Sequence, residues 1–126
     1  MENNMKILVV DDDLLAAEMT SAILEASGYQ TLIAENAIEG LEQIGSNDIA
    51  LVVSDLNMPL VSGIDFFREL REQGSTLPFV ILSGNEAGAL MQTEPRLSAC
   101  LTKDFDLAES LPQIVGQLLS SRPLMQ

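Results

Sequence analysis

Three carboxylates in this sequence follow apolar runs that are short enough to be buried strands. Asp55 follows the run Ile49–Ser54, and Asp11 and Asp12 follow the run Ile7–Val10. Because the carboxyl ends of parallel strands lie along one edge of a sheet, these runs would bring all three side chains into one crevice. A carboxylate at such an edge can act as a nucleophile, and we expect Asp55 to be that group.

The clustered carboxylates need a cation, because like charges held close together disfavour ionisation. A set of hard oxygen ligands suits Mg²⁺ better than zinc or copper, and the chain has no histidine and a single cysteine. Two later apolar runs end in Ser83 and Lys103, which would place a hydroxyl and an ammonium at the same edge. A carboxylate nucleophile, a metal ion, a hydroxyl donor and a fixed positive charge are together suited to phosphoryl transfer.

Each of these residues has a simpler interpretation when it is taken alone. An acidic residue after a strand is usually a turn or cap former, Ser83 before Gly84 is a common turn, and Lys103 is an ordinary surface charge. The chemical interpretation depends on their meeting at Asp55. Asp13 is the exception, since beside the acidic pair it is expected to cap the helix that follows.

Apolar runs alternate five times with segments that can form helices, which predicts an α/β fold. The runs are Ile7–Val10, Gln30–Ala34, Ile49–Ser54, Phe79–Leu82 and Ala99–Thr102. Continuously apolar runs are typical of strands that are covered on both faces. We therefore expect a doubly wound, five-stranded parallel sheet with five helices.

The first three helical segments are marked by caps and by apolar periodicity. In the first, the apolar residues lie on one stripe, and Gly28 ends the helix. That stripe consists of Leu15, Met19, Ala22, Ile23 and Ala26. Asn36 is expected to cap the second helix and Ser62 to open the third. Their apolar positions are Ile38, Leu41 and Ile44 in the second, and Ile64, Phe66, Phe67 and Leu70 in the third.

The last two helical segments are limited by glycine and proline. Gly84, Gly88 and Pro95 bracket the fourth segment, which we expect to be short or irregular between Glu86 and Thr93. Pro112 would break a fifth helix that began as early as Asp106. We therefore expect that helix to begin at Ser110, with the proline in its first turn.

Length and composition fit one ordinary domain, because 126 residues with 47% apolar content can bury a single core. We expect residues 1–121 to form this domain and residues 122–126 to be a tail or a linker stub. Six basic and nineteen acidic residues give a net charge of −13, which repels phosphate backbones and anionic membranes. We therefore expect no direct nucleic-acid binding. Without an apolar signal segment or a bilayer-spanning run, a cytoplasmic protein with no membrane insertion is the default.

The motifs together resemble the receiver domain of two-component response regulators, of the chemotaxis-regulator type, over nearly the whole chain. Lys6–Asp12 resembles the acidic pair after the first strand, and Ser54–Pro59 with Ser62 and Gly63 resembles the phosphoacceptor loop. Ser83 and Lys103 match the hydroxyl and lysine positions of that family. The resemblance implies a flavodoxin-like sheet with strand order 2-1-3-4-5.

The resemblance also implies roles for individual residues. Asp55 would accept a phosphoryl group from a phosphohistidine on a sensor histidine kinase or a histidine phosphotransfer protein. Asp12, Asp55 and the backbone carbonyl of Asn57 would hold Mg²⁺, with Asp11 acting through water. Asn57 and Asn85 would influence how fast water removes the phosphoryl group.

By the same resemblance, the chain would be a phosphoprotein of a phosphorelay and would signal by a conformational change. That change would alter how a downstream protein target docks. The chain would catalyse only its own phosphotransfer, with Lys103 and Ser83 assisting, and its own dephosphorylation, so we expect it not to be an enzyme in the usual sense.

Two positions differ from the family pattern and suggest an alternative. Asp104 follows Lys103, where the family has a proline joined by a cis peptide, and Cys100 replaces the switch aromatic on the fifth strand. A cis bond before a non-proline residue costs about 3–4 kcal/mol, which favours a trans peptide here. The alternative function is that of a pseudo-receiver, an interaction module that works without phosphorylation.

Two other classes use related parts but fit the sequence less well. A phosphatase of the haloacid dehalogenase type also uses aspartate, a hydroxyl and lysine, but its nucleophile follows the first strand and it needs a cap domain. A flavodoxin-like electron carrier shares the architecture, but no hydroxyl-rich phosphate loop follows the first strand here.

Overall fold

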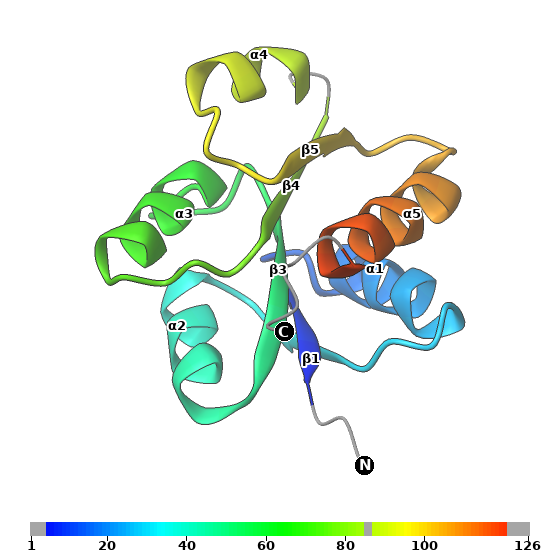
Figure 1. Ribbon diagram of the computed structural model, residues 1–126, viewed down its shortest axis with the longest axis horizontal. Coiled ribbons are helices and arrows are strands. Elements are labelled where there is room, and N and C mark those ends of the chain that lie inside the picture. The colour runs from blue at the N-terminus through cyan, green and yellow to red at the C-terminus, as the bar shows by residue number, and fades with distance from the viewer. Residues whose placement is uncertain (1–4, 85–86, 121–126) are drawn as a thin grey trace.

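The computed structural model describes residues 5–84 and 87–120, in which five strands alternate with five helices (Figure 1). The strands are β1 (Lys6–Val10), β2 (Thr31–Ala34), β3 (Ile49–Asp55), β4 (Phe79–Ser83) and β5 (Ala99–Thr102). The helices are α1 (Leu14–Ala26), α2 (Ala37–Ser46), α3 (Gly63–Glu72), α4 (Ala87–Thr93) and α5 (Leu107–Ser120). The predicted tail at 122–126 lies outside the described residues.

The five strands form one parallel sheet in the order β2-β1-β3-β4-β5, so the predicted fold class is confirmed. Helices α1 and α5 cover one face and α2 and α3 the other, while α4 lies beside the edge strand β5 (Figure 1). In the register of the sheet, Val10 pairs with Ser54, and Ser83 pairs with Thr102. The ends of β1, β3, β4 and β5 therefore meet along one edge, called the carboxyl edge below.

Each face of the sheet has its own apolar core. The core under α2 and α3 is dominated by aromatic rings, and Phe79 on β4 makes edge-to-face contacts with Phe66 and Phe67 at centroid distances of 5.5 and 5.3 Å. The core under α1 and α5 is aliphatic. Its fully or nearly fully buried members are Ile7, Val9, Ala17, Leu24, Leu51, Val53, Val80, Leu82, Leu111 and Val115. Strands with apolar side chains on both faces explain the continuous apolar runs of the sequence.

The predicted caps of the first three helices are confirmed. The Asp13 side chain accepts hydrogen bonds from the backbone N–H groups of Leu15 and Ala16. Asn36 and Ser62 cap α2 and α3 in the same way. Such caps satisfy backbone donors that the first turn of a helix leaves free.

The predicted apolar stripe of α1 is only partly buried, through Ile23, which packs against the aliphatic core. Leu15 and Met19 are 68% and 62% exposed, and the buried face consists instead of Ala17, Thr20, Ser21 and Leu24. Ser21 can face the sheet here because its hydroxyl is hydrogen-bonded to that of Thr31, which also donates to Glu25 at 2.9 Å. In α2, the apolar residue Ile38 is likewise 64% exposed.

The predicted start of α5 at Ser110 is wrong, because the helix begins at Leu107 and contains Pro112. Backbone bonds to the carbonyl of Asp106 from Glu109 and Ser110 form the first turn. Pro112 then removes one donor, whose partner would be the carbonyl of Ala108. Burial of apolar side chains along the helix on the aliphatic core offsets this one missing bond.

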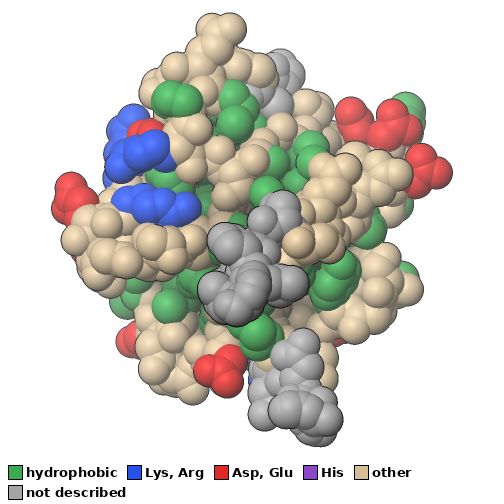
Figure 2. Space-filling view, viewed as in Figure 1, with side chains coloured by type: hydrophobic (Ala, Val, Ile, Leu, Met, Phe, Trp, Pro, Cys, Tyr) green, Lys and Arg blue, Asp and Glu red, His purple; other side chains and the backbone are tan. Residues whose placement is uncertain are grey.

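Helix α4 is short, as predicted, and an ion-pair cluster lies where the chain leaves it. Glu94 is 5% exposed and accepts hydrogen bonds from Arg68 on α3 at 3.0 Å and from Arg96 at 2.7 Å. Figure 2 shows basic side chains gathered between the regions of α3 and α4. Hydrogen bonds from the two guanidinium groups lower the pKa of Glu94 to about 2. This cluster joins the end of α4 to α3.

No helix within 5–84 and 87–120 is long and apolar enough to cross a bilayer.

The ion-pair cluster predicts a pH-dependent stability. Because the folded-state pKa of Glu94 lies below its ordinary 4.5, its contribution is present above about pH 4.5 and is lost as the pH falls toward 2. We expect Glu94→Gln to lower the free energy of unfolding at pH 7 by about 1 kcal/mol, because it removes the charged partner of both arginines. The loss is small because the two arginine side chains are largely exposed to solvent, which weakens ion pairs. Urea unfolding at several pH values should show this difference shrinking below pH 4.5.

The matched control is Glu42→Gln, which changes an exposed glutamate on α2. It should leave stability almost unchanged at every pH. A Glu94→Gln difference that stayed constant from pH 7 to pH 3 would contradict the assignment.

Candidate functional site

The sheet brings the three carboxylates of the sequence prediction together at the carboxyl edge. Asp55 is the last residue of β3, and Asp11 and Asp12 follow β1, the neighbouring strand. Each of these residues offers a carboxylate oxygen, and the oxygens lie within 4.8 Å of one another. Asp11 is buried and Asp12 is exposed. The group therefore opens to solvent through Asp12, and its hard oxygens suit a divalent cation.

Lys103 supplies the positive charge of the site from the end of β5. Its Nζ lies 2.6 Å from Oδ1 of Asp55 and 3.6 Å from Oδ2 of Asp11. Burial alone would lower the pKa of Lys103, but its hydrogen bond to Asp55 and the two negative charges outweigh burial, so the pKa is raised. Its backbone N–H donates to the carbonyl of Ser83 at 2.8 Å, which fixes where the side chain starts. Lys103 is thus a permanent cation beside Asp55.

Asp11 is the most confined carboxylate of the three. Its Oδ1 accepts a hydrogen bond from the backbone N–H of Asp13 at 3.0 Å. Burial raises its pKa, the bond from Asp13 opposes this, and the charge of Asp55 raises the pKa further. A raised carboxyl pKa is the expected result of gathering carboxylates in a partly buried site, and a bound cation would reverse it.

Ser83 brings an unpaired hydroxyl to the same edge. The residue ends β4, one strand from Asp55, and is 1% exposed. Its Oγ has no hydrogen-bond partner among the described residues. Buried hydroxyls are nearly always paired, so this donor is available to an oxygen-bearing group that enters the site.

The loop after Asp55 is held close to it by Gly63. The N–H of Gly63 donates to the carbonyl of Leu56 at 2.8 Å. A Cβ atom on Gly63 would lie 2.4 Å from the carbonyl oxygen of Asp55, so only glycine fits. The sequence places this glycine in the phosphoacceptor-loop resemblance and at the start of a helix, but its contact with the backbone of Asp55 is visible only in the structure.

Two further residues were predicted to belong to the site, Asn57 and Asn85. Asn57 lies in the same loop, two residues beyond Asp55, with its side chain exposed. Asn85, which was expected to influence dephosphorylation, lies outside the described residues.

The structure shows the backbone and contacts of Asp104 and Cys100, the two positions that depart from the family pattern. The described residues contain no cis peptide bond, so the Lys103–Asp104 peptide is trans. Asp104 Oδ1 accepts from the N–H of Asp106 at 3.1 Å and so shapes the turn into α5. Cys100 pairs in register with Ile81 and packs, partly buried, against the aromatic core.

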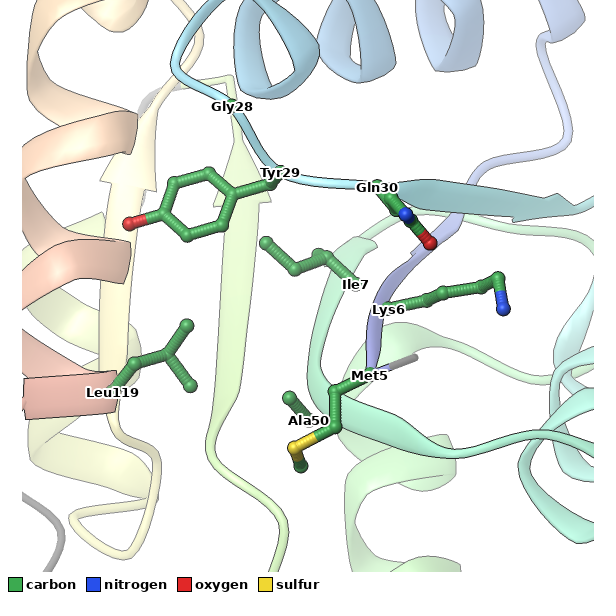
Figure 3. A pocket seen from close by; sticks show the side chains of 8 residues that line it. All are labelled: Met5, Lys6, Ile7, Gly28, Tyr29, Gln30, Ala50 and Leu119. Atoms are coloured by element: carbon green, nitrogen blue, oxygen red, sulfur yellow. The ribbon is translucent and has the colours of Figure 1, made fainter. Parts of the chain in front are cut away.

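A pocket of about 320 Å³ at the opposite edge of the sheet is unrelated to these groups (Figure 3). It is lined by residues near the starts of β1 and β3 and by the loop before β2, such as Ile7, Ala50 and Tyr29. None of its lining residues carries a carboxylate. This pocket is therefore separate from the carboxylates of the candidate site.

Comparison with known proteins agrees with this arrangement. The family model of the response regulator receiver domain matches residues 7–115. A probable transcriptional regulatory protein of Picosynechococcus sp. is 32% identical over 118 residues, which cover 86% of this chain and 47% of that protein. The chain spans about half the length of the curated relatives it matches.

Two solved structures are similar over nearly the whole chain. The response regulator receiver domain protein from Clostridium thermocellum has a TM-score of 0.84 and 27% identity, covering 97% of this chain and 99% of that one. Response regulator protein TrrA from Thermotoga maritima, in complex with Mg²⁺-BeF, has a TM-score of 0.78 and 27% identity, covering 90% of this chain and 98% of that one. With the family model matching 7–115, these likenesses show that the chain belongs to the response regulator receiver domain family.

Proposed function

We propose that Asp55 accepts a phosphoryl group from a phosphohistidine on a sensor histidine kinase or histidine phosphotransfer protein. One observation carries this proposal: a carboxylate at the carboxyl edge is paired at 2.6 Å with Lys103, beside two more carboxylates and a buried, unpaired hydroxyl. The group contains a nucleophile, a fixed cation and a hydrogen-bond donor for an incoming anion. These are the parts that phosphoryl transfer requires.

In the proposed step, a carboxylate oxygen of Asp55 forms a bond to phosphorus while the bond from phosphorus to the imidazole nitrogen breaks. The electron pair of the broken bond stays on the imidazole nitrogen, and the ring takes up one proton from water so that it leaves as neutral imidazole. Lys103 remains beside the new acyl phosphate, and the Ser83 hydroxyl donates to one of its oxygens. Both groups are in place before the reaction, so little reorganisation is needed.

Asp12, Asp55 and the backbone carbonyl of Asn57 are the proposed ligands of Mg²⁺, with Asp11 acting through water. The donor set fits this ion, because it consists of oxygens and leaves room for water. When bound, Mg²⁺ would supply positive charge against the phosphoryl oxygens. That TrrA was solved with Mg²⁺-BeF at 27% identity supports the assignment.

The output would be a change in how a downstream protein target docks, rather than turnover of a substrate. The proposal therefore describes a phosphoprotein of a cytoplasmic phosphorelay that catalyses only its own phosphotransfer and dephosphorylation, not an enzyme acting on other substrates. The carboxylate set and its pairing with Lys103 do not favour the pseudo-receiver alternative. The name of the Picosynechococcus relative mentions transcription, so the expected lack of nucleic-acid contact remains a prediction about these 126 residues alone.

Phosphorylation by a small donor tests the proposed function directly. Acetyl phosphate with Mg²⁺ should add one phosphoryl group to the native chain, and Asp55→Asn should abolish the addition because an amide is not a nucleophile. Intact-mass spectrometry measures the product. Asp48→Asn, just before the other end of the same strand, is the matched control and should be labelled like the native chain; a product that persisted in Asp55→Asn would exclude Asp55 as acceptor.

Mg²⁺ binding tests the ligand assignment. Asp12→Asn should weaken binding by about tenfold or more, because it removes one of the proposed carboxylate ligands. Asp13→Asn is its neighbour control, since asparagine preserves the α1 cap but also removes one negative charge. Calorimetric titration should show that Mg²⁺ affinity falls much more in Asp12→Asn than in Asp13→Asn. Equal losses of affinity in the two variants would mean that only the overall negative charge attracts the ion.

A further inference from the structure

Leu60 has a backbone conformation that leucine rarely adopts. Its φ is +71°, and it is the sole described non-glycine residue with a positive φ. The N–H of Val61 donates to the carbonyl of Pro59 at 2.7 Å, across Leu60. This bond closes a three-residue γ-turn of the strained type. Glycine or asparagine would occupy such a turn at lower cost.

The fold gives no packing reason for leucine at this position. The residue is 98% exposed, so its side chain gains almost nothing from burial in this chain. A strained backbone and a fully exposed apolar side chain are both unfavourable, and they occur together at one residue. Strain of this kind clusters at active sites, ligand clamps and switch regions.

Leu60 lies on the rim of the carboxylate site. It lines a pocket of about 210 Å³ together with Asp12 and with Ile38, which is 64% exposed. The same loop begins at Asp55, five residues earlier. Two exposed apolar side chains therefore flank the side of the site where Asp12 opens to solvent.

We infer that Leu60 is a specificity-determining contact for the protein that donates the phosphoryl group, an inference that rests on the proposed function. A protein-bound phosphohistidine can reach Asp55 only if its own surface covers the carboxyl edge around this site. Leu60, held outward by the γ-turn, contacts that surface together with Ile38.

The lining of the pocket defines the chemistry of the donor surface. Asp12 and Glu35 are its acidic members, and it has no basic one. The complementary surface presents an apolar side chain to Leu60 and Ile38 and carries lysine or arginine at its border. A small donor such as acetyl phosphate makes no such contact.

Two donors of different size test the inference. The probes are acetyl phosphate and a phosphorylated histidine kinase, chosen from a panel because it phosphorylates the native chain. Leu60→Asn should lower kcat/KM for the kinase donor by about tenfold, mainly through KM, and keep the acetyl phosphate rate within about twofold. Leu60→Met should restore transfer from the kinase. Thermal unfolding should show Leu60→Asn to be at least as stable as the native chain, since asparagine tolerates the turn.

Met5→Asn is the matched control, because Met5 is also an exposed apolar residue but lies at the opposite edge of the sheet. It should leave both rates unchanged. Unchanged kinase transfer in Leu60→Asn would overturn the inference, and so would an equal loss with both donors, which would assign the leucine a role within the chain. A native chain labelled by acetyl phosphate but by no kinase of the panel would overturn the donor assignment, whereas no labelling by either donor would refute the proposed function itself.

Discussion

Repulsion among the three carboxylates at the carboxyl edge is the constraint on which the rest of the site depends. Asp11, Asp12 and Asp55 come from two adjacent strands, and their oxygens lie within 4.8 Å of one another. Lys103 balances this charge from β5, two strands from Asp55, so the order of the sheet is itself a requirement of the site. The hydrogen bond from the Lys103 backbone to Ser83 on β4 fixes the position of the ammonium. The close approach of Gly63 fixes the loop beside the Asp55 carboxylate.

The sheet and most of the site could be predicted because they rest on short-range patterns. Buried parallel strands are apolar on both faces, so each appears as a continuous run, and the polar residue that ends a run must lie at the carboxyl edge. Asp55, Ser83 and Lys103 were located in this way. Caps were equally predictable, since Asp13 and Asn36 satisfy backbone donors only a few residues away.

The failures come from features that depend on partners distant in sequence or on exposed surfaces. Periodicity alone places Leu15 and Met19 on one apolar stripe, but α1 turns a face of small and polar residues to the sheet, with the Ser21 hydroxyl bonded to a hydroxyl on β2. The helix α5 tolerates Pro112 because tertiary burial outweighs one missing bond. Nothing local indicates that Glu94 bonds to Arg68, 26 residues earlier, or that Leu60 takes a positive φ.

The Lys103 ammonium is the resident counter-ion of the carboxylate site, and one titration tests this role most directly. Mg²⁺ affinity should be measured by calorimetry for the native chain and for Lys103→Met, a variant of similar length without the charge. If Lys103 already balances Asp55 and Asp11, its removal should tighten Mg²⁺ binding by about tenfold, because the incoming cation no longer meets a positive neighbour. Unchanged or weaker binding in Lys103→Met would contradict the account.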